Sequence, residues 1–244
     1  MSDGIRFELD GHVARVTIDR PHVLNALDDT AQQRLEQIWQ EIEASRDVRV
    51  VVLTGSGDRA FCVGADMSAV GNNKTGVDYW AEGRPNGFGG LALRETLDVP
   101  VIARLNGYTL GGGLEMALGC DILVASETAQ LGLTEPRVGR VPLDGGVTRL
   151  VRQAPYHQAM GLLNEVVPAG DLDAAIDRWV GDVLACAPLS LRAIKHMVQN
   201  GARLSPREAQ SLRSPALVAA LRSKDSDEGV RAFQEKRAPI WRGE

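Results

Sequence analysis

The feature that most constrains the fold is a set of short, nearly continuous apolar runs. Val48 to Leu53 is the clearest of them, and Val101 to Leu105 and Ile122 to Ala125 are similar. Short runs rich in β-branched residues are typical of strands buried on both faces of a parallel sheet. Between Leu27 and Ile42 the apolar residues fall at helical spacing instead, with Asp28 as the expected N-cap. Strands and helices therefore alternate, which predicts an α/β layered body.

The two ends of the chain differ from this body. Ile5 to Leu9 and Val13 to Ile18 alternate apolar and polar residues around Asp10-Gly11, which predicts a hairpin. After Pro168 the periodicity becomes helical, and Pro and Gly residues punctuate it. Helices are expected over 171–187, 191–199, 206–221 and 227–236. We therefore divide the chain into an α/β core, 1–168, and a helical region, 169–244.

Composition and residue spacing argue against several classes of protein. The net charge of −5 does not favour nucleic-acid binding through a basic face. Cys62, Cys120 and Cys186 are odd in number and widely spaced, and the four histidines show no metal-ligand spacing, so no disulfide framework or metal site is expected. No signal peptide and no membrane-spanning run is evident. We expect a cytoplasmic protein without a metal ion.

The turn Gly55-Ser-Gly-Asp-Arg-Ala60 follows a buried strand and loosely matches a dinucleotide-binding fingerprint. That fingerprint requires a helix whose N-terminus meets the pyrophosphate, and residues 61–64 do not continue as an amphipathic helix. A tight turn is therefore favoured over a nicotinamide-dependent reductase. Further along, Gly71 to Gly90 is rich in Gly and Asn and has little periodicity, so we interpret it as a candidate lid.

Three consecutive glycines, Gly111 to Gly113, precede a helix-like segment that carries Glu115. Unpaired N–H groups at a helix start, with the helix dipole behind them, stabilise an anion or a developing oxyanion. Glu115 comes three residues after Gly112, one turn into the helix, so its side chain can face the same spot. Glycines for close packing and a surface glutamate explain the segment equally well, and local features do not decide.

Glu135 lies between an apolar, strand-like stretch and a turn rich in Pro and Gly. Turns at strand ends commonly hold catalytic groups over a rigid scaffold. Taken alone, Glu135 is better explained as a solvated turn carboxylate.

Together with Ala60-Phe-Cys-Val-Gly-Ala-Asp-Met67, these segments resemble the enoyl-CoA hydratase/isomerase (crotonase) superfamily. The resemblance covers nearly the whole chain, in the family's order. Its other parts are Arg20-Pro21 with Leu24-Asn-Ala-Leu27, the Asn-Gly-Tyr-x-Leu-Gly-Gly-Gly-x-Glu segment, the Glu-x-x-x-Gly-x-x-Pro turn, and the tail Ala232 to Arg237. It implies a crotonase-like spiral of β-β-α units, followed by C-terminal helices that form trimers and usually hexamers.

The resemblance also implies an enzyme that acts on CoA thioesters. The backbone N–H groups of Ala65 and Gly112 would form an oxyanion hole for the enolate that develops on the thioester. Water addition needs two acid/base groups. By resemblance, Glu115 would handle the water or leaving hydroxyl and Glu135 the Cα proton. CoA would enter as part of the substrate, without a separate cofactor.

The family pattern further implies a set of contacts to CoA. Within one subunit these are Leu24, Ala26, Gly64, Asp66, Met67 and Gly111. A neighbouring subunit would add Phe233 and Lys236.

Three alternatives stay open. Gly87 to Leu91, Val141 to Gly146 and Pro239 to Gly243 lean toward the carnitinyl-CoA dehydratase branch, whose acyl group bears a quaternary ammonium. Lid aromatics at Tyr79, Trp80 and Phe88 could face such a cation. An isomerase that uses one glutamate is a second alternative, and a non-catalytic protein that binds CoA esters or RNA is a third.

The chain departs from the family pattern in one place. After Met160 relatives usually continue through a Thr-Gly turn and another helix, but here the strand-like Gly161 to Pro168 follows almost at once. Either a helix has been deleted or a segment has been omitted. Because that segment helps to wall the acyl pocket in relatives, the departure bears on which acyl chains fit.

Overall fold

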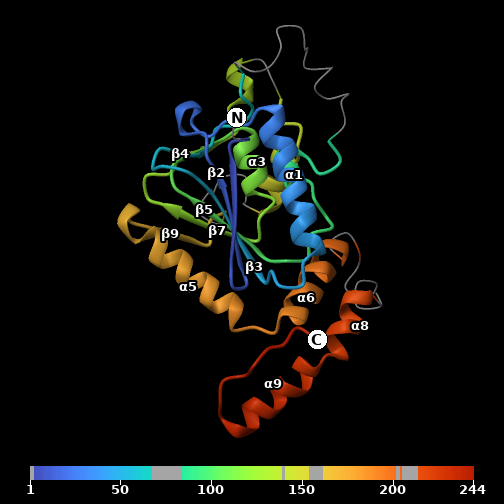
Figure 1. Ribbon diagram of the computed structural model, residues 1–244. Coiled ribbons are helices and arrows are strands. Elements are labelled where there is room, and N and C mark those ends of the chain that lie inside the picture. Colours follow the sequence, from blue (N-terminus) through green and yellow to red (C-terminus); the bar gives the residue numbers. More distant parts are fainter. Residues whose placement is uncertain (1–2, 68–83, 139–140, 154–161, 202–203, 205–213) are drawn as a thin grey trace.

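A computed structural model describes residues 3–67, 84–138, 141–153, 162–201, 204 and 214–244. Strands and helices alternate as far as β9, and helices follow (Figure 1). The departure after Met160 falls mostly in 154–161, outside the described residues. In chain order the elements, with 3-10 turns marked η, are β1 (Ile5–Asp10), β2 (Val13–Ile18), η1 (Pro21–Val23), α1 (Asp29–Ala44), β3 (Val50–Gly55), β4 (Ala60–Cys62), η2 (Phe88–Gly90), β5 (Val101–Leu105), β6 (Tyr108–Leu110), α3 (Gly112–Ala117), β7 (Ile122–Ser126), β8 (Leu131–Gly132), η3 (Glu135–Val138), α4 (Gly146–Gln153), β9 (Glu165–Val167), η5 (Ala169–Asp171), α5 (Leu172–Leu184), α6 (Pro188–Gly201), α8 (Pro215–Leu221) and α9 (Lys224–Glu235).

The strands form two sheets. The larger has the order β1-β2-β3-β5-β7-β9, in which β1 and β2 make the predicted antiparallel hairpin and all later neighbours are parallel. The smaller sheet is parallel, with the order β4-β6-β8. From β3 onward successive strands therefore enter the two sheets alternately. This is the spiral of repeating units that the resemblance implied.

The inner strands β3, β5 and β7 of the larger sheet are buried on both faces, as their apolar runs predicted. In β3, Val51 and Leu53 pack in the core beneath α1, whereas Val50 and Val52 pack against α5 on the opposite face. Successive side chains of a strand point to opposite faces, so a strand covered on both sides must be apolar throughout. The Val48 to Leu53 run is the direct consequence.

Helix α1 fixes a neighbouring segment that bears on the site. Its N-terminus is capped by Asp28, whose carboxylate accepts a hydrogen bond from the Ala31 N–H at 2.8 Å. The buried Trp39 indole donates to the Gly89 carbonyl at 2.8 Å, which holds η2 against α1. Phe88 is 1% exposed. The end of the Gly71–Gly90 segment is thus part of the core, which corrects the interpretation of Phe88 as a lid aromatic. Tyr79 and Trp80 lie outside the described residues.

The C-terminal helices differ in how closely they pack against the body of the molecule. Helix α5 covers the second face of the larger sheet, whereas α8 and α9 extend away from it (Figure 1). The helix predicted over 206–221 is described only from Pro215, behind the N-cap Ser214, and α9 begins at Lys224 rather than at 227. The division of the chain at residue 168 stays a prediction. None of the described helices is long and apolar enough to cross a lipid bilayer.

Candidate active site

The start of α3 lies directly against the end of β4. A Cβ atom at Gly113 would lie 2.1 Å from the Cys62 carbonyl oxygen, so this approach requires glycine. A Cβ atom at Gly64 would lie 3.2 Å from the Gly112 nitrogen. The backbone around Gly64 and Ala65 therefore lies beside the first residues of α3. The sequence predicted this proximity only through the family resemblance.

Two backbone N–H groups meet in this region. Leu27 N–H donates to the Gly64 carbonyl and Leu27 O accepts from Asp66 N–H, both at 2.9 Å, so the Ala65 N–H points away from Leu27. Gly112 is the first residue of α3, and the first N–H groups of a helix lack intrahelical acceptors. Within the described part of the chain, neither N–H group donates a hydrogen bond. Their predicted role as an oxyanion hole stays a prediction.

Glu115 is buried beneath the loop that precedes α4. It is 3% exposed, and its Oε1 atom accepts hydrogen bonds from the Asp144 and Gly146 N–H groups, both at 2.9 Å. A Cβ atom at position 146 would lie 2.9 Å from the same oxygen, so glycine makes room for the carboxyl group. The surface-glutamate explanation of Glu115 is therefore wrong.

The environment of Glu115 changes its acidity. Burial raises the pKa of Glu115 to about 7, because it disfavours the charged form. The negative charges of Asp144 and Glu135 contribute to this rise, while the two N–H donors act in the opposite direction. The carboxyl group therefore exchanges its proton near neutral pH, as a general acid or base must.

Glu135 reaches the same place from a different element. It begins η3, just after β8, and its Oε1 atom lies 3.4 Å from where a Cβ atom on Gly111 would be. Its Oε2 atom is buried and has no hydrogen-bond partner among the described residues. Glu135 is thus half-buried beside the start of α3 rather than a solvated turn residue. This buried oxygen therefore has an unused capacity to accept a hydrogen bond.

Asp144 is a third carboxylate at the site, and the sequence did not single it out. Its N–H group holds Glu115, and the residue is 8% exposed. Burial raises the pKa of Asp144, and the positive charge of Arg84 acts in the opposite direction. The signal in the sequence was the segment Val141 to Gly146, quoted above only for its likeness to one branch of the superfamily.

The predicted CoA contacts near the N-terminus lie around an ion-pair cluster. The Arg20 guanidinium contacts the Ala26 carbonyl, the Asp28 carboxylate at 2.7 Å and the Asp66 carboxylate at 3.1 Å. Ala26 and Asp66 are both buried, and their polar atoms face Arg20 rather than solvent. Asp66 consequently ties two loops together, a role that the resemblance did not imply.

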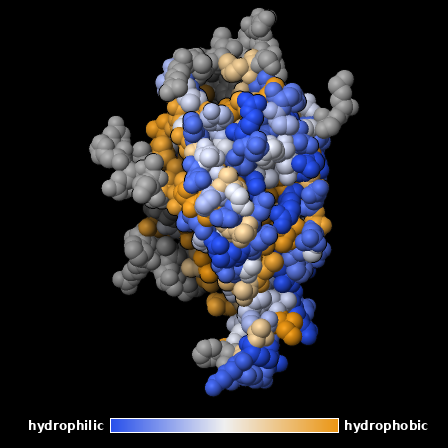
Figure 2. Space-filling model, turned by 90° about the vertical axis from the view of Figure 1, so that its left-hand side faces the viewer, coloured by the Kyte–Doolittle hydropathy of each residue, from blue (hydrophilic) through white to orange (hydrophobic). Residues whose placement is uncertain are grey.

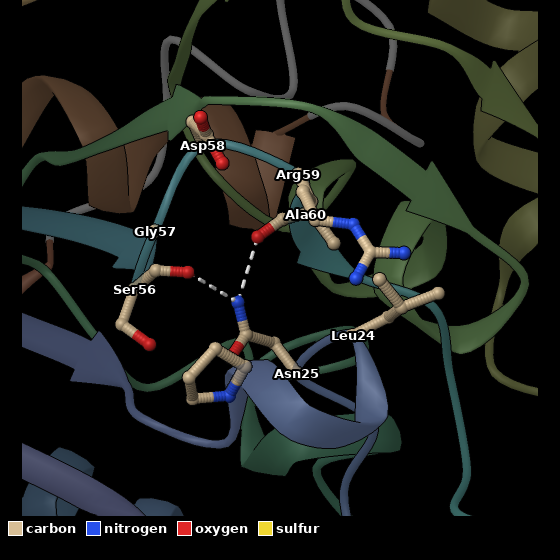
Figure 3. A pocket seen from close by; sticks show the side chains of 8 residues that line it. Leu24, Asn25, Ser56, Gly57, Asp58, Arg59 and Ala60 are labelled. Atoms are coloured by element: carbon tan, nitrogen blue, oxygen red, sulfur yellow. Dashed lines mark hydrogen bonds between the residues drawn. The ribbon is translucent and has the colours of Figure 1, made fainter.

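A small pocket lies next to this cluster (Figure 3). Asn25 donates from its buried side-chain amide to the carbonyls of Ser56 at 3.0 Å and Ala60 at 2.7 Å, which holds its loop against the β3–β4 turn. The turn runs into β4 and not into a helix, which confirms the tight-turn interpretation. The lining residues, of which Leu24 was a predicted CoA contact, are Pro21, Leu24, Asn25, Ser56, Gly57, Asp58, Arg59 and Ala60.

Other predicted contacts are not gathered by a single chain. Met67 is exposed next to Asp66. Lys236 is exposed and follows α9 directly. Helix α9 lies at the opposite end of the molecule from α3 (Figure 1). The Phe233 side chain lies outside the described part. In the ranges that the structure describes, no group of three or more His, Cys, Asp or Glu side chains is placed to hold a metal ion.

The fold and the paired carboxylates define a protein of the crotonase superfamily. The chain superimposes on the solved structure of an enoyl-CoA hydratase from Bacillus anthracis with a TM-score of 0.87 and 29% sequence identity, over 99% of this chain and 100% of that one. The family model for enoyl-CoA hydratase/isomerase matches residues 8–161. The chain belongs to the enoyl-CoA hydratase/isomerase family.

Two characterised relatives match over almost their whole length. The (E)-benzylidenesuccinyl-CoA hydratase of Thauera aromatica is 35% identical, over 98% of this chain and 99% of its own. The carnitinyl-CoA dehydratase of Proteus mirabilis is 32% identical, over 100% of both. The first alignment spans 259 positions, more than the 244 residues of this chain, so that relative carries residues that this chain lacks.

Proposed function

We propose that the protein is an enoyl-CoA hydratase, which reversibly adds water across the double bond of a 2-enoyl-CoA. The observation that carries this proposal is the position of Glu115 and Glu135 at the start of α3, near the Ala65 and Gly112 N–H groups, which donate no hydrogen bond to any residue that the structure describes. The two relatives named above are, by their names, a hydratase and a dehydratase of acyl-CoA substrates, which supports a carbon–oxygen lyase.

The proposed hydration uses each group once. Glu115 takes a proton from water as the water oxygen bonds to Cβ of the substrate. The electron pair of the double bond moves toward the thioester oxygen, where the Ala65 and Gly112 N–H groups stabilise the developing negative charge. Glu135 then delivers a proton to Cα. Dehydration is the reverse sequence, in which Glu115 protonates the leaving hydroxyl.

This assignment gives both directions the same pH dependence. Hydration starts with Glu115 ionised and Glu135 protonated, and dehydration starts with Glu115 protonated and Glu135 ionised, so both need one proton on the pair. With a pKa of about 7 for Glu115, the pair loses that proton above about pH 7, and kcat/KM for hydration and for dehydration should fall together. One titrating group thus governs both profiles.

The first experiment follows the absorbance of the conjugated thioester of crotonyl-CoA. We expect the wild type to remove this absorbance, and Glu115→Gln and Glu135→Gln each to slow the reaction by about 10²- to 10⁴-fold, the usual contribution of a general acid or base. Glu127→Gln, at an exposed carboxylate just after β7, is the matched control and should retain full activity. Full activity in either active-site variant would contradict the two-carboxylate mechanism.

The same assay separates the alternatives. Turnover of a 3-enoyl-CoA without incorporation of water, with only one glutamate required, would identify an isomerase. Preference for crotonobetainyl-CoA over crotonyl-CoA would place the protein nearer to the carnitinyl-CoA dehydratases. Binding of CoA esters without turnover of any of these substrates would favour a non-catalytic role.

We also propose that the working form is a homotrimer or homohexamer. Large apolar side chains lie exposed on α6, where Ile194 is 57% and Val198 64% exposed four residues apart on one face. Figure 2 shows an apolar band along one edge of a face that is otherwise mostly polar. Assembly through this exposed apolar surface would also let Lys236 approach the proposed CoA site of a neighbouring subunit.

A further inference from the structure

We propose that Asp144 is a positioning residue for the hydration reaction: its main chain holds the Glu115 carboxyl group, and its buried carboxylate keeps a proton on Glu115 in the resting site. This inference rests on the proposed function only for its catalytic consequence. Its structural part, the influence of one buried carboxylate on another, can be tested without turnover.

The geometry places both parts of Asp144 at Glu115. The Asp144 N–H donates to Glu115 Oε1 at 2.9 Å, so the two residues are in direct contact. Asp144 is 8% exposed as a residue, and within the described residues its carboxylate accepts no hydrogen bond. A buried carboxylate without donors lowers the stability of a protein. Any residue could supply the N–H group. The presence of a carboxylate at this position is therefore better explained by its effect on the protonation of Glu115.

The charges around Glu115 come from several elements. The negative charge of Asp144, in the loop before α4, and that of Glu135, in η3, both act on Glu115. Arg84, just before η2, lies within electrostatic range of Asp144 and offsets part of its charge. Arg149 of α4 donates to the Leu118 carbonyl at 3.4 Å. The charged groups that act on Glu115 are therefore two carboxylates, whose effect adds to burial and opposes that of the two N–H donors.

The consequence concerns the pH range of the reaction. The pair of carboxyl groups needs one proton in both directions, on Glu135 to begin hydration and on Glu115 to begin dehydration. A negative charge beside Glu115 favours its protonated form, because a second like charge in a buried site is costly. Asp144 therefore leaves the overall equilibrium unchanged and raises the pH up to which the pair keeps its one proton.

The decisive variant is Asp144→Asn, which keeps the N–H group and the size of the side chain and removes the charge. We expect the midpoint of the pH profile of kcat/KM for crotonyl-CoA hydration to move down by about 1 pH unit. Asp182→Asn removes the same charge from an exposed position on α5 and should leave the midpoint unchanged. A profile that keeps its midpoint in Asp144→Asn, whatever happens to the rate, would overturn the proposal.

A second measurement does not depend on turnover. The infrared carboxyl band of Glu115, identified by its loss in Glu115→Gln, is titrated in the wild type and in Asp144→Asn, with Asp144→Ser as a second variant should the first fail to fold. We expect the band to persist to higher pH in the wild type. Identical titrations would refute the role of Asp144. If crotonyl-CoA is not hydrated but the titrations differ, the proposed function fails and the influence of Asp144 on Glu115 stands.

Discussion

At the scale of single residues, the site places acidic groups where burial works against their ionisation. Glu115 has a pKa of about 7 in the folded protein, above the ordinary value of 4.5, chiefly because it is buried. The folded state therefore holds this proton more tightly than the unfolded state does. Stability from this group falls as pH rises from about 4.5 to about 7 and is constant above that range. Glu115 thus lowers the stability of the fold at neutral and alkaline pH.

Glu115→Gln should relieve this cost. Relative to the wild type, we expect the free energy of unfolding of the variant to increase between about pH 5 and about pH 8, by up to about 3 kcal/mol. Urea unfolding at both pH values and at one protein concentration measures the difference. Glu127→Gln, which changes an exposed carboxylate, should show no such trend. A stability difference for Glu115→Gln that does not vary with pH would contradict the raised pKa.

At the scale of elements, the site depends on how closely α3 approaches β4. Gly113 is in contact with the Cys62 carbonyl, and this contact sets the position of the Gly112 N–H and of Glu115 one turn later. Helix α3 has six residues and is too short to be stable alone, so its packing defines it. The glycines therefore permit a close approach, and the proposed anion-stabilising role of the Gly112 N–H depends on that approach.

Gly113→Ala should push the start of α3 away from β4. The added Cβ atom would lie 2.1 Å from backbone, so we expect a loss of about 3 kcal/mol in stability, together with loss of hydration activity. Gly181→Ala on α5 is the matched control, because a Cβ atom there meets nothing within 4 Å. Alanine is also the better helix former, so that variant should be equal to or more stable than the wild type. Equal denaturation midpoints for the two variants would show that α3 can shift without cost.

At the scale of the whole molecule, the arrangement of the C-terminal helices bears on the proposed assembly. Helices α8 and α9 project from the body, and α9 is anchored by its tail, since Asp225 accepts hydrogen bonds from the Arg242 N–H at 2.7 Å and the Gly243 N–H at 2.8 Å. A projecting helical arm and exposed apolar side chains on α6 are features that assembly would cover. We therefore expect the arm to contact other subunits.

Sedimentation should show a trimer or hexamer at micromolar concentration. The double variant Ile194→Glu/Val198→Glu should shift the distribution toward monomer, because burying two carboxylates in an apolar contact is unfavourable. Leu9→Glu, at a similarly exposed position on the edge strand β1, should leave the assembly unchanged. A monomeric wild type would contradict the proposed assembly.

Much of the fold could be predicted from the chain because it follows local periodicity. The hairpin around Gly11, the Asp28 cap and the two-sided strand from Val50 are each determined by neighbours in sequence. The limits of the helices after Pro168 were less well predicted, since α9 begins at Lys224 rather than 227. Helix ends depend on capping and packing as much as on periodicity.

The sequence by itself determined the order of strands and helices, the family, and which two glutamates are candidates for catalysis. Only the tertiary structure decided that Glu115 is buried, that Phe88 belongs to the core, and that Asp144 and Arg20 are parts of the site region. These four facts depend on groups far apart in the chain, such as Arg20 with Asp66 and Glu115 with Gly146. Sequence periodicity reports which face of an element is apolar, whereas burial and charge at a site depend on what the rest of the chain places against it.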